Sequence, residues 1–164
     1  MENRLHFDSP IGTILVISSN KGIAQINIGC CVENNLQTTG DGHLLANCKQ
    51  QILDYLSGKR RQFDLPLDWE MCGKFQREVL QLTLEIPFGE VRTYGELART
   101  LGKSAASRAV GGALARNPLP LLIPCHRVVA ATGALTGYSA ASGIATKAWL
   151  LGLEGHKIVS QKLG

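Results

Sequence analysis

Three short segments lie near the start of the chain: apolar and polar residues alternate with a two-residue period at residues 4–7 and 23–28, and residues 14–17 between them are a short apolar run. This two-residue period is typical of β-strands with one buried face, and in the third segment it places Ala24, Ile26 and Ile28 on the same side. Two turn sequences, Ser9-Pro-Ile-Gly and Asn20-Lys-Gly, separate the segments. The pattern therefore predicts a small antiparallel sheet.

The period changes after a polar stretch at residues 29–42, which we expect to be a loop. Between His43 and Leu56 the apolar side chains recur at helical spacing, and Gly58 is a suitable stop. The predicted apolar face comprises Leu44, Leu45, Cys48, Ile52, Tyr55 and Leu56. With residues 61–67 returning to the sheet, we expect an α/β domain over residues 1–67.

A linker is predicted over residues 68–74, followed by a mainly helical domain over residues 75–164. Its first helix should span residues 75–85. The stripe of that helix that we expect to be buried comprises Phe75, Val79 and Leu82.

Two short helices follow. Thr93-Tyr-Gly-Glu96 has the spacing of a capping box, and that helix should end at Leu101 before a glycine. The next helix must end by Arg116, because Asn117 precedes Pro118 and is biased away from the α region. Two helices joined by a glycine-containing turn make a helix-turn-helix candidate. The second is rich in alanine and glycine, so it could approach a partner closely or pack tightly inside the domain.

The end of the chain alternates between loop and helix. Residues 135–143 are small and polar and should form a loop, and residues 145–154 should form the last helix, stopped by Gly155. The face of that helix that we expect to point inward comprises Ala145, Ala148, Trp149 and Leu153. From His156 the tail is basic, and we expect it to be loosely held.

Composition changes this picture little. In 164 residues no apolar run approaches the ~20 residues of a membrane span, and Met1–His6 lacks the apolar segment of a secretory signal. Five cysteines without framework spacing favour a reducing compartment. We therefore expect a protein without membrane contact in the cytoplasm, or in the nucleus of a eukaryotic cell.

The net charge of +4 is unevenly spread. Residues 1–85 carry eight Lys/Arg and ten Asp/Glu, for a net charge of −2, whereas residues 86–164 carry nine and three, for +6. This asymmetry favours a polyanionic partner for the second half, with an ordinary solvated face as the alternative.

The candidate metal ligands of the first domain are Cys30, Cys31, Cys48, His6 and His43. Adjacent cysteines rarely bind the same ion, and the chain has no C-x-x-C pair, whereas structural zinc sites usually have tight ligand spacing. We therefore predict no metal, and cysteines that are buried or surface thiols.

The candidate chemistry lies in residues 118–129, an apolar run that ends in Pro124-Cys-His-Arg127. Pro124 fixes φ and delivers Cys125 rigidly. A thiolate is a good nucleophile, His126 is the nearest base, and Arg127 adds positive charge nearby. A buried cysteine beside a surface histidine is the alternative. Spacing alone does not distinguish a cysteine hydrolase, a thiol transferase and a redox sensor.

Several motifs resemble one known family. They are Ile86-Pro-Phe-Gly-Glu, Thr93-Tyr-Gly-Glu-Leu-Ala, Arg108-Ala-Val-Gly-Gly-Ala-Leu-Ala-Arg-Asn-Pro, Ile123-Pro-Cys-His-Arg-Val-Val, Gly133-Ala-Leu-Thr-Gly-Tyr and Leu150-Leu-Gly-Leu-Glu-Gly, together with Lys147. The chain from Phe75 to Tyr138 resembles, without gaps, the O6-alkylguanine-DNA alkyltransferases (methylated-DNA–protein-cysteine methyltransferases), and the N-terminal part does so loosely. The resemblance implies an α/β (α+β) N-terminal domain followed by a winged-helix or helix-turn-helix-like catalytic domain.

The resemblance also implies the reaction. A monomer would bind double-stranded DNA, rotate an O6-alkylguanine out of the stack, and transfer the alkyl group irreversibly to Cys125 without a cofactor. O4-alkylthymine is a further candidate substrate. A non-catalytic sensor of alkylated DNA is the main alternative, although family members of that kind lack the cysteine. A cysteine hydrolase fits the helix-turn-helix and the basic half less well.

Roles carried over from the family stay implications of the resemblance. His126 would take the proton from Cys125 through a water, Glu154 would orient His126, and Asn117 would brace the cysteine segment. Tyr94 would contact the rotated nucleotide and donate to guanine N3. The plainer readings are a surface acid for Glu154, a helix C-cap for Asn117 and a core aromatic for Tyr94.

The second helix of the pair would be the recognition helix. Its DNA contacts, besides Tyr94, would come from Arg108, Ala109, Gly112 and Ala115. Arg108 would fill the gap left by the base, or simply contact phosphate. The guanine pocket would be lined by Pro120, Val128, Tyr138 and Ser139.

Two features depart from the family. Leu80 and Thr83 stand where the family tends to have tryptophan and an apolar residue. Eight residues separate Tyr138 from Lys147 where the family usually has six. The longer loop puts the contact of Ser139 and the accepted alkyl size in question, and Ser142-Gly143 could supply the backbone N–H for O6 instead.

Overall fold

The structure, a computed structural model, describes residues 2–30 and 42–164. The chain divides into two compact units, residues 1–71 and 72–164, and each is described by itself. Within the described residues, no helix is long and apolar enough to cross a membrane.

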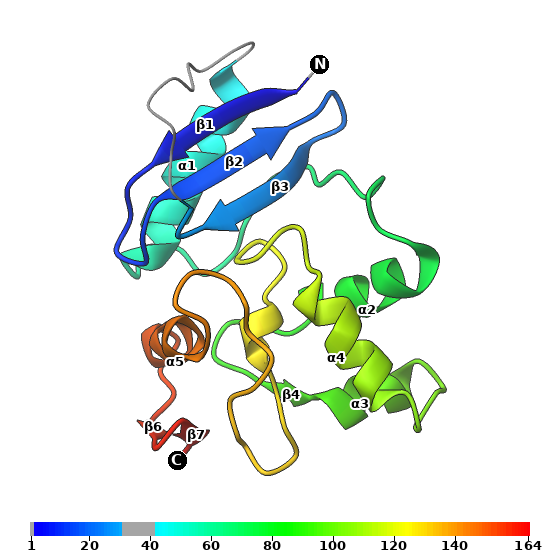
Figure 1. Cartoon of the computed structure of the whole chain (residues 1–164). Helices are drawn as coiled ribbons and strands as arrows, with labels where there is room; N and C mark the ends of the chain where they lie inside the picture. The colour runs from blue at the N-terminus through cyan, green and yellow to red at the C-terminus, as the bar shows by residue number, and fades with distance from the viewer. Residues whose placement is uncertain (1, 31–41) are drawn as a thin grey trace. The chain divides into compact units, whose positions relative to one another are not determined.

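The first unit is a three-stranded sheet with one helix against it (Figure 1). The strands β1 (Asn3–Phe7), β2 (Ile14–Ser18) and β3 (Ile23–Ile28) pair antiparallel in the order β1-β2-β3. Helix α1 (Gly42–Leu56) packs on β1 and β2. The predicted antiparallel sheet is confirmed; residues 31–41, most of the predicted loop, lie outside the described residues.

Two details of this unit differ from the prediction. The register between β2 and β3 shifts after Ile17, so that Ser18 faces Ile23. This bulge buries Ile23 with the other two isoleucines of β3 and leaves Ala24 half-buried. Residues 61–67 form no strand; only Leu67 makes a bridge, to Ile23.

The second unit is mainly helical, as predicted, and has two very short sheets. Its elements are α2 (Lys74–Leu84), β4 (Arg92–Thr93), α3 (Tyr94–Thr100), α4 (Ser107–Ala115), the 3-10 turn η1 (Cys125–Arg127), β5 (Val128–Val129), α5 (Ile144–Leu153), β6 (Ile158–Val159) and β7 (Lys162–Leu163). Strands β4 and β5 pair in parallel, which ties the start of α3 to the end of η1. Strands β6 and β7 form a hairpin.

The helix-turn-helix consists of α3 and α4, which pack on each other and on α2. Thr93 and Glu96 form the predicted capping box, and Gly102 ends α3 with a φ of +71°. Helix α4 is held by a buried face of Val110, Ala113 and Leu114. Its other face is left to solvent.

Two helices turn different faces inward than predicted. Helix α2 buries Val79 with Leu80 and Thr83, while Phe75 is half-buried with the Lys103 ammonium 5.1 Å from its ring centroid. In α5 the buried residues are Thr146, Lys147, Leu150 and Leu151, and Trp149 is 41% exposed. Helix α5 is apolar on nearly every side, so periodicity could not identify its inner face.

The C-terminal tail is ordered, contrary to the prediction. Hairpin residues Ile158 and Leu163 pack against the cluster of Val129, Leu135 and Leu151. The backbone continues this contact, because the N–H groups of Leu135 and Leu163 donate to Gln161 and Gly133 carbonyls at 3.0 and 3.1 Å. The prediction rested on the basic residues of the tail and did not take into account its apolar residues Ile158 and Leu163.

Candidate active site

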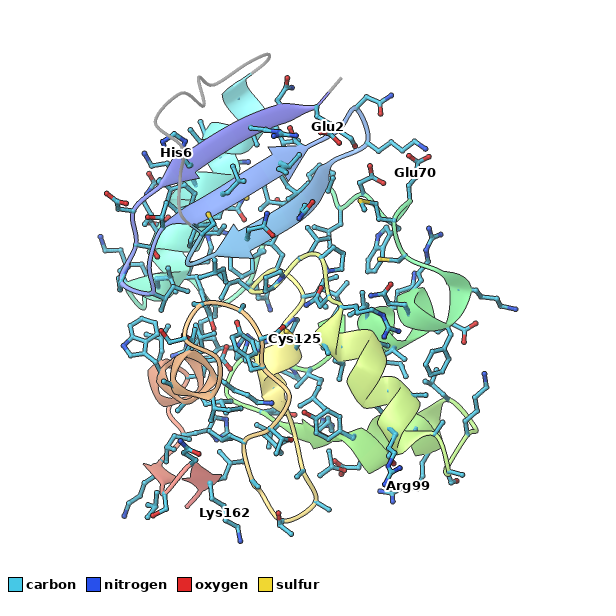
Figure 2. All side chains as sticks on the ribbon, in the orientation of Figure 1. Glu2, His6, Glu70, Arg99, Cys125 and Lys162 are labelled. Atoms are coloured by element: carbon cyan, nitrogen blue, oxygen red, sulfur yellow. The ribbon has the colours of Figure 1, made fainter. Side chains whose placement is uncertain are left out.

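Cys125 is presented at the end of a rigid, buried segment. Residues 119–124 are buried, and Leu121 has a φ of +74°. The Ile123 N–H donates to the Leu119 carbonyl at 2.9 Å, and the Cys125 N–H donates to the Ile123 carbonyl at 2.8 Å. Cys125 then begins η1 as a half-buried free thiol, with α5 packed beside the turn (Figure 2).

The Asn117 side chain spans this segment. Its amide nitrogen donates to the Ile123 carbonyl at 3.0 Å, and its oxygen accepts from the Leu119 N–H at 2.9 Å. The C-cap of α4 is Arg116, so Asn117 is free of that role. The two hydrogen bonds fix the backbone that leads to the thiol.

His126 and Glu154 meet at the same turn, both fully or almost fully buried. His126 Nε2 lies 3.0 Å from Glu154 Oε1. An ionised carboxylate can only accept, so His126 donates from Nε2 and keeps the lone pair on Nδ1. Burial, more than any charge, lowers the pKa of His126 below 6.5, which favours the neutral imidazole at neutral pH. The pair can therefore act as a general base.

The positive charge that acts on the thiol differs from the expected one. Burial raises the pKa of Cys125, and the Asn117 amide and the Lys147 ammonium oppose this rise. Arg127 instead directs its guanidinium to Glu154, with its nitrogens 2.7–3.1 Å from the carboxylate oxygens. The cation near Cys125 is therefore Lys147, from α5.

Lys147 is 1% exposed and donates to two carbonyls, those of Val128 at 2.6 Å and Thr136 at 2.7 Å. Burial lowers its pKa to about 8. From the sequence, Lys147 is only one of the residues that carry the family resemblance, because the predicted inner face of this helix does not include it. A lysine three residues before the buried Leu150 was the available signal.

Tyr94 lies next to a cleft on the surface of the second unit. The cleft is lined by Tyr94, Ser107, Arg108, Gly111, Thr136 and Gly137. The Tyr94 hydroxyl donates to the Thr136 carbonyl at 2.9 Å. Burial raises the pKa of Tyr94, the hydrogen bond with Thr136 opposes this rise, and the charge of Cys125 adds to it.

Of the four predicted pocket residues, three are buried and one is exposed. Tyr138 is buried, and burial followed by the Cys125 charge raises its pKa well above 10. Pro120 bridges to Ile123 within the cysteine segment, and Val128 follows η1. Ser139 is exposed, with its hydroxyl 3.4 Å from the Ala115 carbonyl.

The longer loop does not offer the N–H groups that we expected. The Ser142 N–H donates to the Thr146 hydroxyl at 3.1 Å, and the Gly143 N–H donates to the Ala140 carbonyl at 2.9 Å. Both donors are therefore already engaged in ordering the start of α5. In this conformation the two N–H groups would have to leave these acceptors before either could donate to O6.

The predicted DNA-contacting residues of α4 share its outer face. Arg108, Ala109 and Ala115 are exposed and Gly112 is half-buried. Arg108 also borders the cleft beside Tyr94, so α4 and the start of α3 line the same cleft. Across residues 2–30 and 42–164, no group of three or more His, Cys, Asp and Glu side chains is placed to hold a metal ion.

Known proteins share both units. Residues 6–69 match the family model "6-O-methylguanine DNA methyltransferase, ribonuclease-like domain", and residues 74–156 match "6-O-methylguanine DNA methyltransferase, DNA binding domain". The methylated-DNA–protein-cysteine methyltransferase of Methanosarcina acetivorans is 40% identical over 159 residues, which cover 91% of this chain and 96% of that protein.

Two crystal structures from Mycobacterium tuberculosis are also similar. The O6-methylguanine methyltransferase has a TM-score of 0.82 at 34% identity, covering 98% of this chain and 96% of that one. OGT in complex with DNA has a TM-score of 0.80 at 36% identity, covering 91% and 90%. The chain thus belongs to the 6-O-methylguanine DNA methyltransferase family, the methylated-DNA–protein-cysteine methyltransferases.

Proposed function

We propose that this protein repairs DNA by transferring the alkyl group of O6-alkylguanine once and irreversibly to Cys125. Membership of the family supports DNA repair by alkyl transfer to a cysteine. The observation that carries the assignment to Cys125 is its place in η1, directly before a buried His126 that is 3.0 Å from Glu154.

The chemistry follows from the charge states at the site. Neutral His126 takes the thiol proton on Nδ1, directly or through a water, and Glu154 stabilises the imidazolium that forms. The sulfur then attacks the alkyl carbon while the bond from that carbon to O6 breaks. The released electron pair stays on the guanine, which takes up a proton. The thioether that results has no free thiol, so the protein reacts only once.

The leaving group needs a proton donor, and Tyr94 fits this role. Its hydroxyl now donates to the Thr136 carbonyl at 2.9 Å, so binding of the nucleotide would exchange that acceptor for guanine N3. Pro120, Val128, Tyr138 and Ser139 would surround the base. Tyr138 is suited to such a pocket because it combines a buried ring with a hydroxyl that has no hydrogen-bond partner within the described structure.

Duplex DNA would bind as the partner of a monomer, along the outer face of α4. A base inside the duplex is shielded, so it must be rotated out at a cost of roughly a few kcal/mol. Arg108 borders the cleft and is exposed, and it would fill the space that the base leaves. The small residues Ala109, Gly112 and Ala115 would let the helix approach the groove closely.

The test is a duplex that carries one O6-methylguanine, incubated with the protein, followed by mass measurement of the peptide that contains Cys125. One methyl group per protein, lost in Cys125→Ala, supports the proposal. Binding without a mass increase would instead indicate a sensor, and repeated turnover of a small ester or amide would indicate a hydrolase. Duplexes with O4-methylthymine or larger O6 groups define the substrate range in the same assay.

A further inference from the structure

Arg127 makes more contacts to Glu154 than His126 does. Its Nε donates to both carboxylate oxygens, at 3.1 and 2.9 Å, and its Nη2 donates to Oε1 at 2.7 Å. Its Nη1 donates to the Ile86 carbonyl at 2.6 Å, and the Phe88 ring centroid lies 5.9 Å from the guanidinium. Arg127 is 7% exposed. The guanidinium is therefore fixed at both ends.

The ionisation of Glu154 depends on such a partner. Glu154 is 5% exposed, and a carboxylate removed from water becomes protonated unless charge and hydrogen bonds compensate. Further hydrogen bonds to this carboxylate come from His126 and, at 3.4 Å, from the Gly89 N–H. Arg127 is the cation among these donors.

The protonation of Glu154 decides which nitrogen of His126 can act as a base. An ionised carboxylate accepts from Nε2 and leaves a lone pair on Nδ1. A protonated Glu154 would donate to Nε2, so the hydrogen of the neutral ring would move to Nδ1. An ionised Glu154 without Arg127 would favour the imidazolium, because its charge would act on the ring unopposed. In both cases Nδ1 of His126 no longer has the lone pair that accepts the proton of the Cys125 thiol.

We propose that Arg127 is a positioning residue for alkyl transfer: by holding Glu154 ionised and oriented, it keeps His126 in the neutral form with hydrogen on Nε2 and the lone pair on Nδ1. This inference rests on the proposed function of His126 as the base for Cys125. It assigns Arg127 a role through Glu154, and no contact with the DNA or the thiol.

The charges around His126 agree with this assignment. After burial, Glu154 raises the pKa of His126, and Arg127 and then Lys147 lower it. These groups come from η1 and from α5 with its C-cap. Helix α2 also packs against η1, but its Lys74 and Arg77 are exposed and its Glu78 is half-buried. Arg127 is thus the cation that most directly offsets Glu154.

The experiment measures the tautomer and the pKa of His126 by nitrogen NMR, on unreacted protein with labelled histidine. For wild type we expect neutral imidazole with hydrogen on Nε2 at pH 7. In Arg127→Gln we expect that form to decrease, and single-turnover methyl transfer at pH 7 to slow by about 10- to 100-fold. Arg127→Lys, which keeps the charge but loses the fork, should retain the tautomer and part of the rate.

An Arg127→Gln variant that keeps the wild-type tautomer, pKa and rate profile would overturn the proposal. If that variant does not fold, Glu154→Gln is compared with the double variant Arg127→Gln/Glu154→Gln. We expect the same His126 tautomer and transfer rate in both, because Arg127 acts through the carboxylate that both lack; a further loss of rate in the double variant would refute the role. Arg92→Gln, which breaks an exposed pair with Glu90, is the matched control.

Wild-type protein that transfers no methyl group would contradict the proposed function while leaving the NMR result valid.

Discussion

The Tyr94 hydroxyl and the Lys147 ammonium donate to the same oxygen, the Thr136 carbonyl, at 2.9 and 2.7 Å. Lys147 Nζ also lies 5.9 Å from the centroid of the Tyr94 ring. The two residues come from α3 and α5, so one carbonyl joins the helix-turn-helix to the helix whose C-cap is Glu154. Tyr94, beside the cleft, and Lys147, the cation that acts on Cys125, are therefore held by the same hydrogen-bond acceptor.

Replacing this buried cation should slow the chemistry. In Lys147→Met the side chain keeps most of its length but loses the charge that favours the thiolate of Cys125. We expect single-turnover methyl transfer to slow by about 10²-fold, as for the loss of one preorganised electrostatic contact, with little change in DNA affinity. Rapid-quench kinetics and a binding titration on the same duplex check this. An unchanged rate would mean that the ammonium serves packing alone.

The pH dependence of wild-type transfer should be bell-shaped. The pKa of His126 lies below 6.5, so the rate should fall as the pH drops through that lower value and the base becomes protonated. The pKa of Lys147 is about 8, so the rate should fall again above pH 8, where the ammonium loses its charge. Because the pKa of Cys125 is raised, direct ionisation of the thiol does not compensate in that range. Single-turnover rates from pH 5 to 9 measure both limbs, and Lys147→Met should lack the alkaline one.

A methyl group on Gly137 should disturb Tyr94. Gly137 has a φ of +71°, and an added Cβ would lie 3.0 Å from the Tyr94 hydroxyl. Gly133 is the matched control, since it has a φ of +82° but its Cβ would meet its nearest atom at 3.6 Å. We expect Gly133→Ala and Gly137→Ala to lose a similar ~1 kcal/mol or more of stability from backbone strain, and only Gly137→Ala to lose methyl-transfer rate. Thermal unfolding measures the loss of stability and the transfer assay measures the loss of rate. An equal loss of rate in the two variants would contradict the prediction that a side chain at Gly137 disturbs Tyr94.

Local signals explain which parts of this fold could be predicted. The capping box of Thr93 and Glu96 lies within four residues, and the strands of the first unit are short runs, alternating or apolar, between turn sequences. The prediction of which face of α5 is buried was wrong, because that face is decided by contacts with residues distant in the sequence. Lys147 is polar by type but has two carbonyl acceptors, those of Val128 and Thr136, far from it in sequence. No periodicity encodes such partners.

The candidate site shows the same division. Cys125 and His126 are consecutive residues, so the sequence alone predicts that they lie close together. The resemblance to the family predicted Glu154 as the partner of the imidazole. The contacts of Arg127 with Glu154 join residues 27 apart, and adjacency to Cys125 had suggested a different role for that charge. Sequence order places a charge near a thiol, but only the turn at η1 decides where the guanidinium points.

Asn117 offers a test of how the cysteine segment is braced. Asn117→Asp keeps the oxygen that accepts from Leu119, but loses the donor to the Ile123 carbonyl and adds negative charge near the thiol. We expect a loss of about 1–3 kcal/mol in unfolding free energy from the unpaired carbonyl. The pKa of Cys125 should also rise further, because the amide that lowers it is gone. Thiol titration with an alkylating reagent measures this rise; a fall in the pKa would refute the assigned influence of Asn117.

Arg108 and Arg116 separate insertion into DNA from general attraction to it. Both are exposed, on or next to α4, but only Arg108 borders the cleft beside Tyr94. In Arg108→Ala we expect reaction with a modified duplex to slow at least tenfold more than reaction with free O6-methylguanine, because the rotated base loses the side chain that replaces it. Arg116→Ala should instead weaken duplex binding for all sequences and reduce its salt dependence by about one phosphate contact. Both variants are measured on both substrates and over a series of salt concentrations.

An equal loss of reaction rate by Arg108→Ala on duplex and free base would contradict the insertion of Arg108 into the duplex. A duplex affinity independent of salt would contradict binding through the basic face of the second unit.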